Sequence, residues 1–488
     1  MQADLFLYIL IFSYPILLFC ITAFRLFFCR ILQCNFYLPV FSHPHVSPAY
    51  PIMISKTECS RSHSIPKPIR TASTELSSSG LLQVNVVNIQ NNFPIRNARV
   101  TITYSGEPTA PLEELSTNAS GQTEEVSLAA PPLEYSLRPG EGQPYSDYNI
   151  MVEAPGFRPV TVEGTEVLPD ATAIQPIRME PETDTEPVEN PIVIPEHTLY
   201  GNYPPKIAEN EIQPVNESGE IVLSRVVVPQ TIVVHDGPPT SNAENYYVPY
   251  RDYIKNVASS EIYATWPQAS ITANVLAIMS FTLNRVYTEH YRNRGYDFTI
   301  TSSTAFDHKW IPGRNIFESI SVIVDEIFDN YLSRPGVRQP ILTQYCDGRQ
   351  VQCLNRGWMT QWGSCSLGER GYSPIEILRH YYGDSIYINT AEEISGIPAS
   401  WPGYDLSIGS PGQKVMQLQE QLDAIATVYT AIPRVNADGV YGPATAASVR
   451  EFQSIFGLPQ TGVVDFATWY KISHIYVGVS GIGELYGA

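Results

Sequence analysis

Glu261 has the surroundings that most favour acid–base chemistry in this sequence. It follows the small residues at 258–260 and precedes two aromatic residues, Tyr263 and Trp266. Apolar and aromatic neighbours disfavour the charged form of a carboxyl group, so such a group keeps a proton near neutral pH. It can then donate that proton to a leaving oxygen. A surface or N-capping glutamate on a helix is the commoner alternative, and composition alone favours it.

Two helices must position this carboxyl group. Residues 248–258 follow a helical period that brings Tyr253, Val257 and Glu261 roughly to one side. Trp266-Pro267 then begins a longer helix, because proline in a first turn has no amide hydrogen to lose. One face of that helix consists mostly of small residues and suits close packing against a neighbouring helix: Ala269, Ala273, Leu276, Ala277, Ser280 and Leu283.

The cysteine pair Cys346 and Cys353 could take three forms. Two thiolates with His308 or Asp307 would suit zinc, which prefers sulfur and imidazole ligands. The same spacing suits a hairpin disulfide or two free buried thiols. All three remain open, and the seven cysteines of the chain do not form a disulfide framework. We expect His290, His308 and His380 to be structural, since their spacing provides no partner.

A resemblance to a known family begins at Val248. Residues 248–277 read V-P-Y-R-D-Y-I-K-N-V-A-S-S-E-I-Y-A-T-W-P-Q-A-S-I-T-A-N-V-L-A. This run resembles the opening of the stage II sporulation protein D and amidase-enhancer family. A later segment, Q-W-G-S…L-G-E-R-G-Y-S-P-I-E-I-L-R-H-Y-Y-G at 361–383, is similar to the family's "S-Q-Y-G-A…Y-x-x-I-L-x-x-Y-Y" pattern, in family order.

The resemblance implies a lytic transglycosylase, which cleaves the bond between N-acetylmuramic acid and N-acetylglucosamine in peptidoglycan. The family's catalytic acid matches Glu261. Tyr263, Trp266 and Gln361 become candidates for contact with the sugars. One carboxyl group suffices and no cofactor is implied, because the sugar's own 6-hydroxyl replaces water as the nucleophile. Ordinary glycoside hydrolysis needs two carboxyl groups.

The chain departs from the family at one segment. The patterns S-x-S-G-G and H-G-x-G-M-S-Q are not intact, and Q-Y-C-D-G-R-Q-V-Q-C-L-N-R-G-W-M-T-Q-W-G-S stands in their place at 344–364. Met359-Thr360-Gln361 is kept, but Asn355 or Arg356 is nearest to the expected histidine. The loss would fit a non-catalytic, degenerate domain, so a wall-binding scaffold or amidase enhancer remains the alternative.

The sequence after Gly409 resembles the three-helix peptidoglycan-binding domain. It reads G-S-P-G-Q-K-V-M-Q-L-Q-E-Q-L, then D-G-V-Y-G-P-A-T-A-A-S-V-R-E-F-Q-S-I-F-G-L and T-G-V-V-D-F-A-T-W, with apolar residues at helical spacing and turn residues between. The two halves form a weak internal repeat. We expect ligand contacts among exposed polar groups, with these candidates: Asp438, Tyr441, Gln453 and Thr468.

The region from Leu81 alternates like strands. Arg99–Tyr104, Tyr148–Glu153 and Val160–Val162 are short alternating runs between Gly, Pro and Asn turns, which indicates a small antiparallel β-sandwich. The order of its markers resembles the carboxypeptidase regulatory-like sandwich and implies a spacer or adhesion module. The Pro- and Glu-rich stretch that follows predicts a semi-extended linker.

The amino-terminal segment leaves three interpretations open. Leu5 to Phe24 is almost continuously apolar and is followed by Arg25 and Arg30, which fits an uncleaved membrane anchor. A secretory signal fits less well, because Asp4 precedes the run. The third interpretation is that residues 1–52 are not native coding sequence and that translation begins at Met53.

The length and net charge of the chain limit its number of domains and its classes of partner. A chain of 488 residues exceeds one ordinary core, and a net charge of −19 disfavours nucleic acid and anionic lipid as partners. We therefore expect a multidomain protein, with a small antiparallel β-sandwich, an α+β sporulation-protein-D-like domain and an all-α peptidoglycan-binding domain. The predicted order is an N-terminal segment at 1–52, a disordered arm at 53–79, the sandwich at 80–180, the linker at 181–225, the middle domain at 226–395 and the binding domain at 403–478.

The expected location is the cell wall, the spore envelope or the membrane, and the expected partners are peptidoglycan glycan strands and other cell-wall hydrolases. A spore-forming, Gram-positive source would fit the resemblance.

Overall fold

The computed structural model describes residues 78–140, 142–183, 191–213, 225–351, 353, 357–396 and 401–480. The chain divides into two compact units, Met1–Lys67 and Pro68–Ala488, and all described residues belong to the second. The predictions for the N-terminal segment, for nearly all of the arm and for Asn355 and Arg356 fall outside the described residues.

The amino-terminal domain has two sheets with their apolar faces turned inward. Alternation in the first strand buries Leu82, Val84 and Val86 and leaves the residues between them partly exposed. One sheet has the order β13-β7-β1-β4, from β1 (Ser78–Asn88), β4 (Val126–Ala130), β7 (Thr172–Met179) and β13 (Ile316–Phe317). The other has the order β3-β2-β5-β6-β8, from β2 (Arg99–Tyr104), β3 (Pro111–Ser116), β5 (Ser146–Glu153), β6 (Val160–Val167) and β8 (Ile192–Val193).

The expectation of a purely antiparallel sandwich is wrong at two strand pairs. β1 pairs with β7 in parallel, and β6 pairs with β8 in parallel. The edge strands β8 and β13 come from the predicted linker and from the middle domain, so the sandwich sheets extend beyond the segment predicted for them. A short helix, α1 (Glu134–Leu137), projects between β4 and β5.

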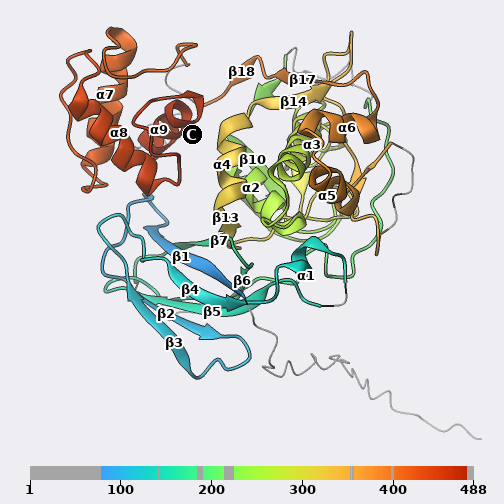
Figure 1. The fold of residues 1–488 in the computed structure, drawn as a ribbon, viewed down its shortest axis with the longest axis horizontal. Coiled ribbons are helices and arrows are strands. Elements are labelled where there is room, and N and C mark those ends of the chain that lie inside the picture. Colours follow the sequence, from blue (N-terminus) through green and yellow to red (C-terminus); the bar gives the residue numbers. More distant parts are fainter. Residues whose placement is uncertain are drawn as a thin grey trace, which may run out of the picture. The chain divides into compact units, whose positions relative to one another are not determined.

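The middle domain is built around one buried helix, α3 (Gln268–Tyr287). It packs against α2 (Tyr250–Glu261), α4 (Glu318–Ile327), α5 (Gln361–Glu369) and α6 (Pro374–Tyr382), as Figure 1 shows. The small residues predicted for its packing face allow this close approach. Ser270 Oγ donates to the carbonyl of Ser364 at 2.9 Å, and Ser280 Oγ donates to the carbonyl of Ile341 at 2.9 Å.

Small sheets complete this domain. One sheet has the order β11-β10-β12; β10 and β11 come before α2 and α3 in the chain, and β12 comes after them. Three further sheets have two strands each. The strands of these sheets are β9 (Val227–Val228), β10 (Thr231–His235), β11 (Asn245–Pro249), β12 (Ile300–Thr301), β14 (Asn330–Ser333), β15 (Tyr345–Cys346), β16 (Met359–Thr360), β17 (Tyr387–Thr390) and β18 (Glu393–Ile394). A short 3-10 helix, η1 (Arg292–Arg294), precedes β12.

The carboxy-terminal domain has three helices, α7 (Gln413–Ala426), α8 (Pro443–Ile455) and α9 (Phe466–Ser480). The weak repeat in its sequence has a structural counterpart. Gln419 accepts a hydrogen bond from the amide of Gly439 at 2.9 Å, and Gln453 accepts one from the amide of Gly462 at 2.8 Å. Each buried glutamine thus holds the turn that precedes the next helix.

Buried ion pairs join the domains. Asp325 on α4 receives Lys255 Nζ at 2.6 Å and Lys471 Nζ of α9 at 3.4 Å. Glu166 of β6 receives Arg314 Nη2 at 2.8 Å, and both side chains are buried. A buried charge needs a partner of opposite sign, so the pairs Asp325–Lys471 and Glu166–Arg314 hold neighbouring domains together.

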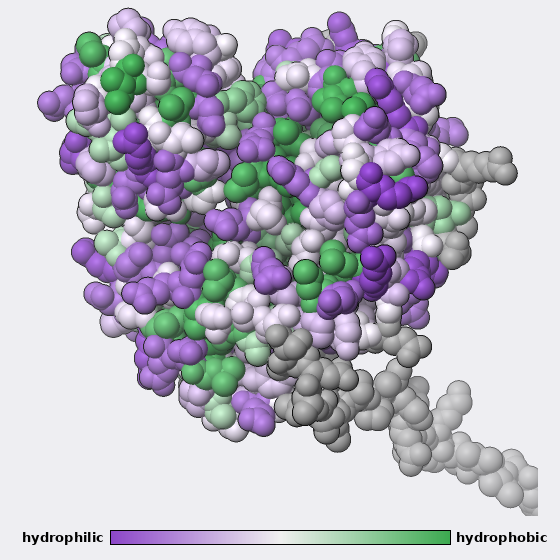
Figure 2. Space-filling view, in the orientation of Figure 1, coloured by the Kyte–Doolittle hydropathy of each residue, from purple (hydrophilic) through white to green (hydrophobic). Residues whose placement is uncertain are grey.

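The described residues contain no helix whose length and hydropathy would suit a bilayer crossing. On the face shown in Figure 2, apolar residues occur as separate groups among hydrophilic ones. That distribution agrees with apolar cores enclosed within the domains.

Candidate active site

Glu261 ends α2, and its carboxyl group is turned inward. Its side chain is 2% exposed. Oε1 accepts the backbone amide of Lys309 at 2.7 Å, and Oε2 accepts the hydroxyl of Tyr345. Burial raises the pKa of Glu261 above the ordinary carboxyl value, and the charge of Lys206 and these two hydrogen bonds offset only part of that effect. The predicted environment of a carboxyl among aromatic groups is therefore present, and Tyr345 belongs to it.

The carboxyl group borders a small hollow. Its volume is 40 Å³, and its walls include Tyr203, Lys206 and Gln361 beside Glu261. A space of that size accommodates water, whereas small-molecule sites typically hold about 300 Å³ or more. In this conformation the hollow admits no sugar ring.

Lys206 is the cation of the site. Its ammonium group lies 4.8 Å from the ring centre of Tyr345 and 5.0 Å from that of Phe281, and it donates to the carbonyl of Asp307. Burial lowers the pKa of Lys206, and the charge of Glu261 opposes that change. Sequence reasoning missed this residue because it lies in the Pro-rich segment assigned to the linker, where nothing in the local pattern marks a buried lysine.

The segment from His197 to Gln213, here called the strap, crosses the middle domain above Glu261. Its main chain is held at several points: the amide of Ile207 donates to the carbonyl of Ala305 at 2.6 Å, and Gln344 Nε2 donates to the carbonyl of Ile207 at 2.7 Å. Thr198, Tyr203, Pro204 and Lys206 of the strap line the hollow. The strap therefore covers the candidate acid, so this part of the predicted linker is packed against the domain.

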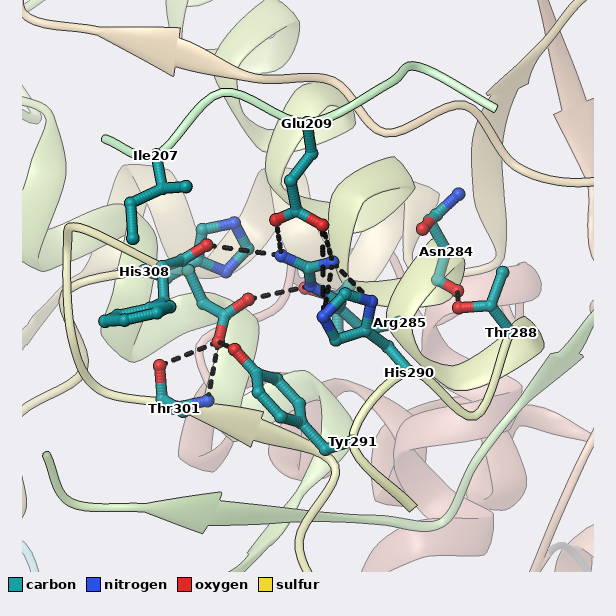
Figure 3. Close-up of polar contacts among 12 residues, drawn as sticks. Ile207, Glu209, Asn284, Arg285, Thr288, His290, Tyr291, Thr301 and His308 are labelled. Carbon is teal, nitrogen blue, oxygen red and sulfur yellow. Dashed lines mark hydrogen bonds and ion pairs between the residues drawn. The ribbon is translucent and has the colours of Figure 1, made fainter. Parts of the chain in front are cut away.

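A buried network anchors the strap to α3, as Figure 3 shows. Arg285 of α3 donates Nη1 to Glu209 at 3.0 Å and Nε to Asp307 at 2.8 Å. Asp307 also accepts the hydroxyl of Tyr291 at 2.6 Å and the amide of Thr301 at 2.9 Å. Burial alone would raise the pKa of Asp307, but Arg285 and these hydrogen bonds lower it, so the carboxylate stays charged.

Two of the histidines assigned structural roles lie in these networks. His308 is buried, its ring is stacked on Tyr345 with centres 5.9 Å apart, and its Nδ1 lies 3.0 Å from the hydroxyl of Tyr253. His290 contacts Arg285, and burial together with that positive charge lowers the pKa of His290 to about 3. Both imidazoles are therefore neutral, and His308 supports the tyrosine that bonds to Glu261.

Gln361 begins α5 beside the acid. Its Nε2 donates to the backbone carbonyl of Glu261 at 3.1 Å, and its side chain lines the hollow. Both residues are site candidates by the family resemblance, and the structure brings them together although they are far apart in the chain. Trp266 is buried instead of facing the hollow, and its indole donates to the carbonyl of Ser136 at 2.9 Å. The prediction that Trp266 contacts a ligand is therefore not supported by its position.

Cys346 and Cys353 form a disulfide, with their Cα atoms 5.5 Å apart. Bonded sulfurs are not zinc ligands, so the zinc alternative for this pair is wrong in this structure. Nor does His308 or Asp307 turn toward the pair, since each contacts the groups described above. Across the described ranges, no three His, Cys, Asp or Glu side chains gather as a metal site would require. The disulfide instead closes the loop that carries Asp347 and Val351, two further walls of the hollow.

Asp347 stiffens that loop. Its carboxylate accepts the amides of Arg349, Gln350 and Val351 at 3.2, 2.9 and 2.7 Å. Aspartate commonly bonds to the amides that follow it in a turn, and Asp-Gly at 347–348 is the signal that could have located this one.

The site has the parts of a one-carboxylate acid catalyst. Burial raises the pKa of Glu261, the hydroxyl of Tyr345 and the amide of Lys309 bond to its two oxygens, and the positive charge of Lys206 favours its carboxylate form. A general acid must carry its proton before the reaction and release it to the leaving oxygen during the reaction.

Comparison with known proteins adds the carboxy-terminal domain. Residues 411–472 match the family described as "Putative peptidoglycan binding domain". These residues form a peptidoglycan-binding domain. The zinc D-Ala-D-Ala carboxypeptidase of Streptomyces albus G is 41% identical over 73 residues, which cover 15% of this chain and 27% of that protein. The chain thus matches about a quarter of the curated relative's length, and the match concerns one domain.

Solved structures give weaker similarities. The Bacillus anthracis TIE protein has a TM-score of 0.15 and 14% identity, with 21% of this chain and 17% of that chain covered. The minor pilin GBS52 of Streptococcus agalactiae has a TM-score of 0.16 and 12% identity over 23% and 49%. The Klebsiella pneumoniae 5-hydroxyisourate hydrolase has a TM-score of 0.15 and 17% identity over 21% and 92%. Scores this low carry no conclusion about this chain.

The peptidoglycan-binding domain places three of the four candidate contact residues differently from expectation. Tyr441, Gln453 and Thr468 are buried, so the premise that they are exposed is wrong. Gln453 Nε2 donates to Thr468 Oγ1 at 3.1 Å, and Tyr441 donates to the carbonyl of Gly462 at 2.9 Å. These contacts hold the fold. Asp438 is exposed, and its carboxylate accepts Gln419 Nε2 at 2.9 Å.

Proposed function

We propose that this protein binds peptidoglycan through residues 411–472 and cleaves its glycan strands as a lytic transglycosylase, with Glu261 as the catalytic acid. The observation that carries the proposal is the buried carboxyl group of Glu261, whose pKa is raised by burial, at the wall of a hollow. The resemblance of residues 248–277 and 361–383 to the sporulation protein D family adds the reaction class. A role in sporulation or spore-wall remodelling belongs to the same proposal, as does the resemblance of the sandwich to the carboxypeptidase regulatory-like domain.

The proposed reaction uses the carboxyl group of Glu261 twice, first as an acid and then as a base. The carboxyl group protonates the glycosidic oxygen as the bond from the muramic acid anomeric carbon to that oxygen breaks. The resulting carboxylate accepts the proton of the 6-hydroxyl of the same sugar as its oxygen bonds to the anomeric carbon. The products are a 1,6-anhydro sugar end and a new free end, and Glu261 is protonated again. Lys206 would stabilise the carboxylate between these steps.

Access to Glu261 requires the strap to move. The hollow of 40 Å³ is too small for a sugar ring, and Tyr203, Pro204 and Lys206 of the strap cover it. Loop displacement on substrate binding is common among enzymes that exclude water from the reaction. We therefore include in the proposal a displacement of Tyr203 and Pro204 that leaves Tyr200 and Lys206 in place.

The closed hollow also favours the second candidate, a non-catalytic peptidoglycan-binding scaffold or amidase enhancer. In that case Glu261 would be a buried structural carboxyl group that holds the end of α2 through Lys309.

One surface of the peptidoglycan-binding domain suits contact with the wall. Val440 and Ile408 are 54% and 60% exposed, and the amide of Gly409 donates to the carbonyl of Tyr441 at 2.9 Å, so these two side chains lie on neighbouring segments. Exposed Asp438 adjoins them. We propose this surface as the wall contact. Val440→Glu should reduce cosedimentation with purified sacculi, and exposed Glu420→Ala should not.

The decisive experiment is digestion of purified peptidoglycan stripped of stem peptides. The parent protein should release 1,6-anhydro ends, and Glu261→Gln should lower the rate by about 100-fold or more. Both proteins should cosediment equally with sacculi. Equal release by the two proteins, or no release by the parent, would eliminate the catalytic role and leave the scaffold.

A further inference from the structure

A second hollow lies beside the Glu261 site and has room for a sugar. Its volume is 310 Å³, within the range of about 300–1,000 Å³ typical of small-molecule sites. It shares Asp347 with the smaller hollow. Gln361 lines the smaller hollow and its neighbour Trp362 lines the larger one, so α5 separates the two.

The walls of this hollow, here called the aromatic hollow, come from three parts of the chain. Tyr135 belongs to α1 of the sandwich, Tyr200 to the strap, and Trp362 to α5. All three side chains are half-buried and line the hollow. Tyr263, one of the predicted sugar contacts, is almost fully buried but also lines this hollow, with its ring centre 5.9 Å from that of Trp362.

The walls are rigid where the domains meet. Arg349 Nη1 donates to the carbonyl of Pro139 at 2.7 Å, and Thr265 Oγ1 donates to Ser136 Oγ at 2.8 Å. The disulfide and the carboxylate of Asp347 hold the loop that carries Arg349. A site held in this way loses little conformational entropy from its loops when it binds a ligand.

The chemistry of the walls indicates a carbohydrate with a negative charge. Aromatic faces pack against the apolar C–H faces of sugar rings, and a few polar groups then fix orientation. Arg349 and Gln350 supply those groups. A guanidinium group pairs with a carboxylate in a planar, directed geometry. N-acetylmuramic acid carries such a carboxylate on its lactyl group once the stem peptide amide-linked there has been removed, and N-acetylglucosamine carries none.

We propose that the aromatic hollow binds a muramic acid residue of the glycan strand, with Tyr135, Tyr200 and Trp362 against the sugar and Arg349 paired with the lactyl carboxylate. This inference rests on the proposed function for its substrate class. It makes the sandwich a wall of the substrate site instead of a spacer. It also explains how a strand could be held beside Glu261 before Tyr203 and Pro204 are displaced.

The test measures binding separately from cleavage. Full-length Glu261→Gln protein is titrated calorimetrically with glycan strands freed of stem peptides, and with chitin oligosaccharides of equal length, which lack the lactyl carboxylate. Trp362→Ala should weaken binding of both ligands by about tenfold. Arg349→Gln should weaken only the muramic acid ligand. Tyr247→Ala, a residue 76% exposed and outside the hollow, is the matched control and should change neither.

Because the peptidoglycan-binding domain also takes up these ligands, the site is located by photo-cross-linking. Oligosaccharides that carry a diazirine should label peptides containing Tyr135 or Trp362. Trp362→Phe should restore binding if the ring, and not a local fold change, is responsible. Labels confined to residues 411–472, or an equal effect of Arg349→Gln on both ligands, would overturn the inference.

The two proposals fail in different ways. If the parent protein is labelled at the aromatic hollow but releases no anhydro ends, the proposed binding site stands and the catalytic role is wrong. If the parent releases anhydro ends and the Trp362→Ala substitution leaves KM unchanged, the catalytic role stands and the proposed binding site is wrong.

Discussion

Arg314 of the middle domain donates to Oε2 of Glu166 in the sandwich at 2.8 Å, and both side chains are buried. His197 of the strap contacts the same carboxylate oxygen at 3.1 Å. Burial alone would raise the pKa of Glu166, but Arg314 and His197 together lower it. One carboxylate thus joins the sandwich, the strap and the middle domain.

Glu166→Gln should therefore destabilise the protein strongly. It leaves the buried charge of Arg314 without its partner, which typically costs about 3–5 kcal/mol. The control is Glu153→Gln, whose partner Arg99 is 59% exposed, and such surface pairs contribute about 0–1 kcal/mol. Urea unfolding measures both. The double variant Glu166→Leu/Arg314→Leu should recover much of the loss, and a cost for Glu166→Gln no larger than the control would contradict the role of this joint.

The helices of the candidate site could be predicted from the sequence. Proline before α3, the helical period of α2 and the small-residue face of α3 are local patterns, and the structure has helices at Tyr250–Glu261 and Gln268–Tyr287. The strand at Arg99–Tyr104 was predicted with the bounds that the structure gives. Alternation and capping depend on near neighbours, so one chain segment is enough to indicate them.

The partners of Glu261 could not be predicted in the same way. Lys206 and Tyr345 are 55 or more positions from it in one direction or the other, and tertiary packing alone brings them together. Burial of Gln453 was missed for a related reason. A glutamine on a helix is usually exposed, and only the turn at Gly462 shows why this one faces inward.

Tyr345→Phe should shift the pH dependence of the candidate acid. The tyrosine hydroxyl stabilises the charged carboxylate and so lowers the pKa of Glu261 against the larger effect of burial. Loss of a hydrogen bond to a charged group, about 1.5–3 kcal/mol, corresponds to about one to two pH units. The alkaline limb of kcat/KM should move to higher pH by that amount.

Carbon-13 NMR titration of the Glu261 side chain checks the same shift without relying on activity. Tyr382→Phe is the control, because that buried hydroxyl donates to the carbonyl of Gln344 at 3.0 Å and not to Glu261. If the titration of Glu261 is the same in Tyr345→Phe as in the parent protein, the hydrogen bond does not tune the acid.

Glu261→Gln should stabilise the protein at high pH only. The folded pKa of Glu261 is raised, so the folded state binds more protons than the unfolded state between the unfolded and folded pKa values. The contribution of Glu261 to stability is thus fully present below the unfolded pKa of about 4.5 and lost as pH rises through the folded pKa. Glutamine carries no charge to desolvate and can still accept the amide of Lys309.

The Tm of Glu261→Gln should therefore exceed that of the parent at pH 8 but not at pH 4. The corresponding difference in the free energy of unfolding is about 1.4 kcal/mol for each unit by which the pKa is raised. Glu420→Ala, at an exposed position, should show no such dependence. A Tm difference that is equal at both pH values would mean that burial does not perturb this carboxyl group.

Reduction of the disulfide should loosen the loop beside Glu261. Cys346 and Cys353 are seven positions apart, and closure of so short a loop contributes about 2–3 kcal/mol. A thiol reductant should lower the Tm of the parent and leave Cys346→Ser/Cys353→Ser unchanged, whereas a zinc chelator should affect neither. Cys365→Ser, at a buried free thiol, should keep the response to reductant. A parent that responds to chelator but not to reductant would restore the zinc interpretation.

Gln453→Leu should abolish wall binding through loss of the fold. The side chain of Gln453 accepts the amide of Gly462 at 2.8 Å and donates to the carbonyl of Val463 at 2.9 Å. Leucine leaves both buried groups unpaired, at about 1–3 kcal/mol each. Cosedimentation with sacculi and the helical circular dichroism signal should fall together, while Ser454→Ala, one position further along α8 and exposed, should change neither. Loss of cosedimentation with an intact helical signal would instead assign Gln453 a direct role at the ligand, as the sequence had predicted.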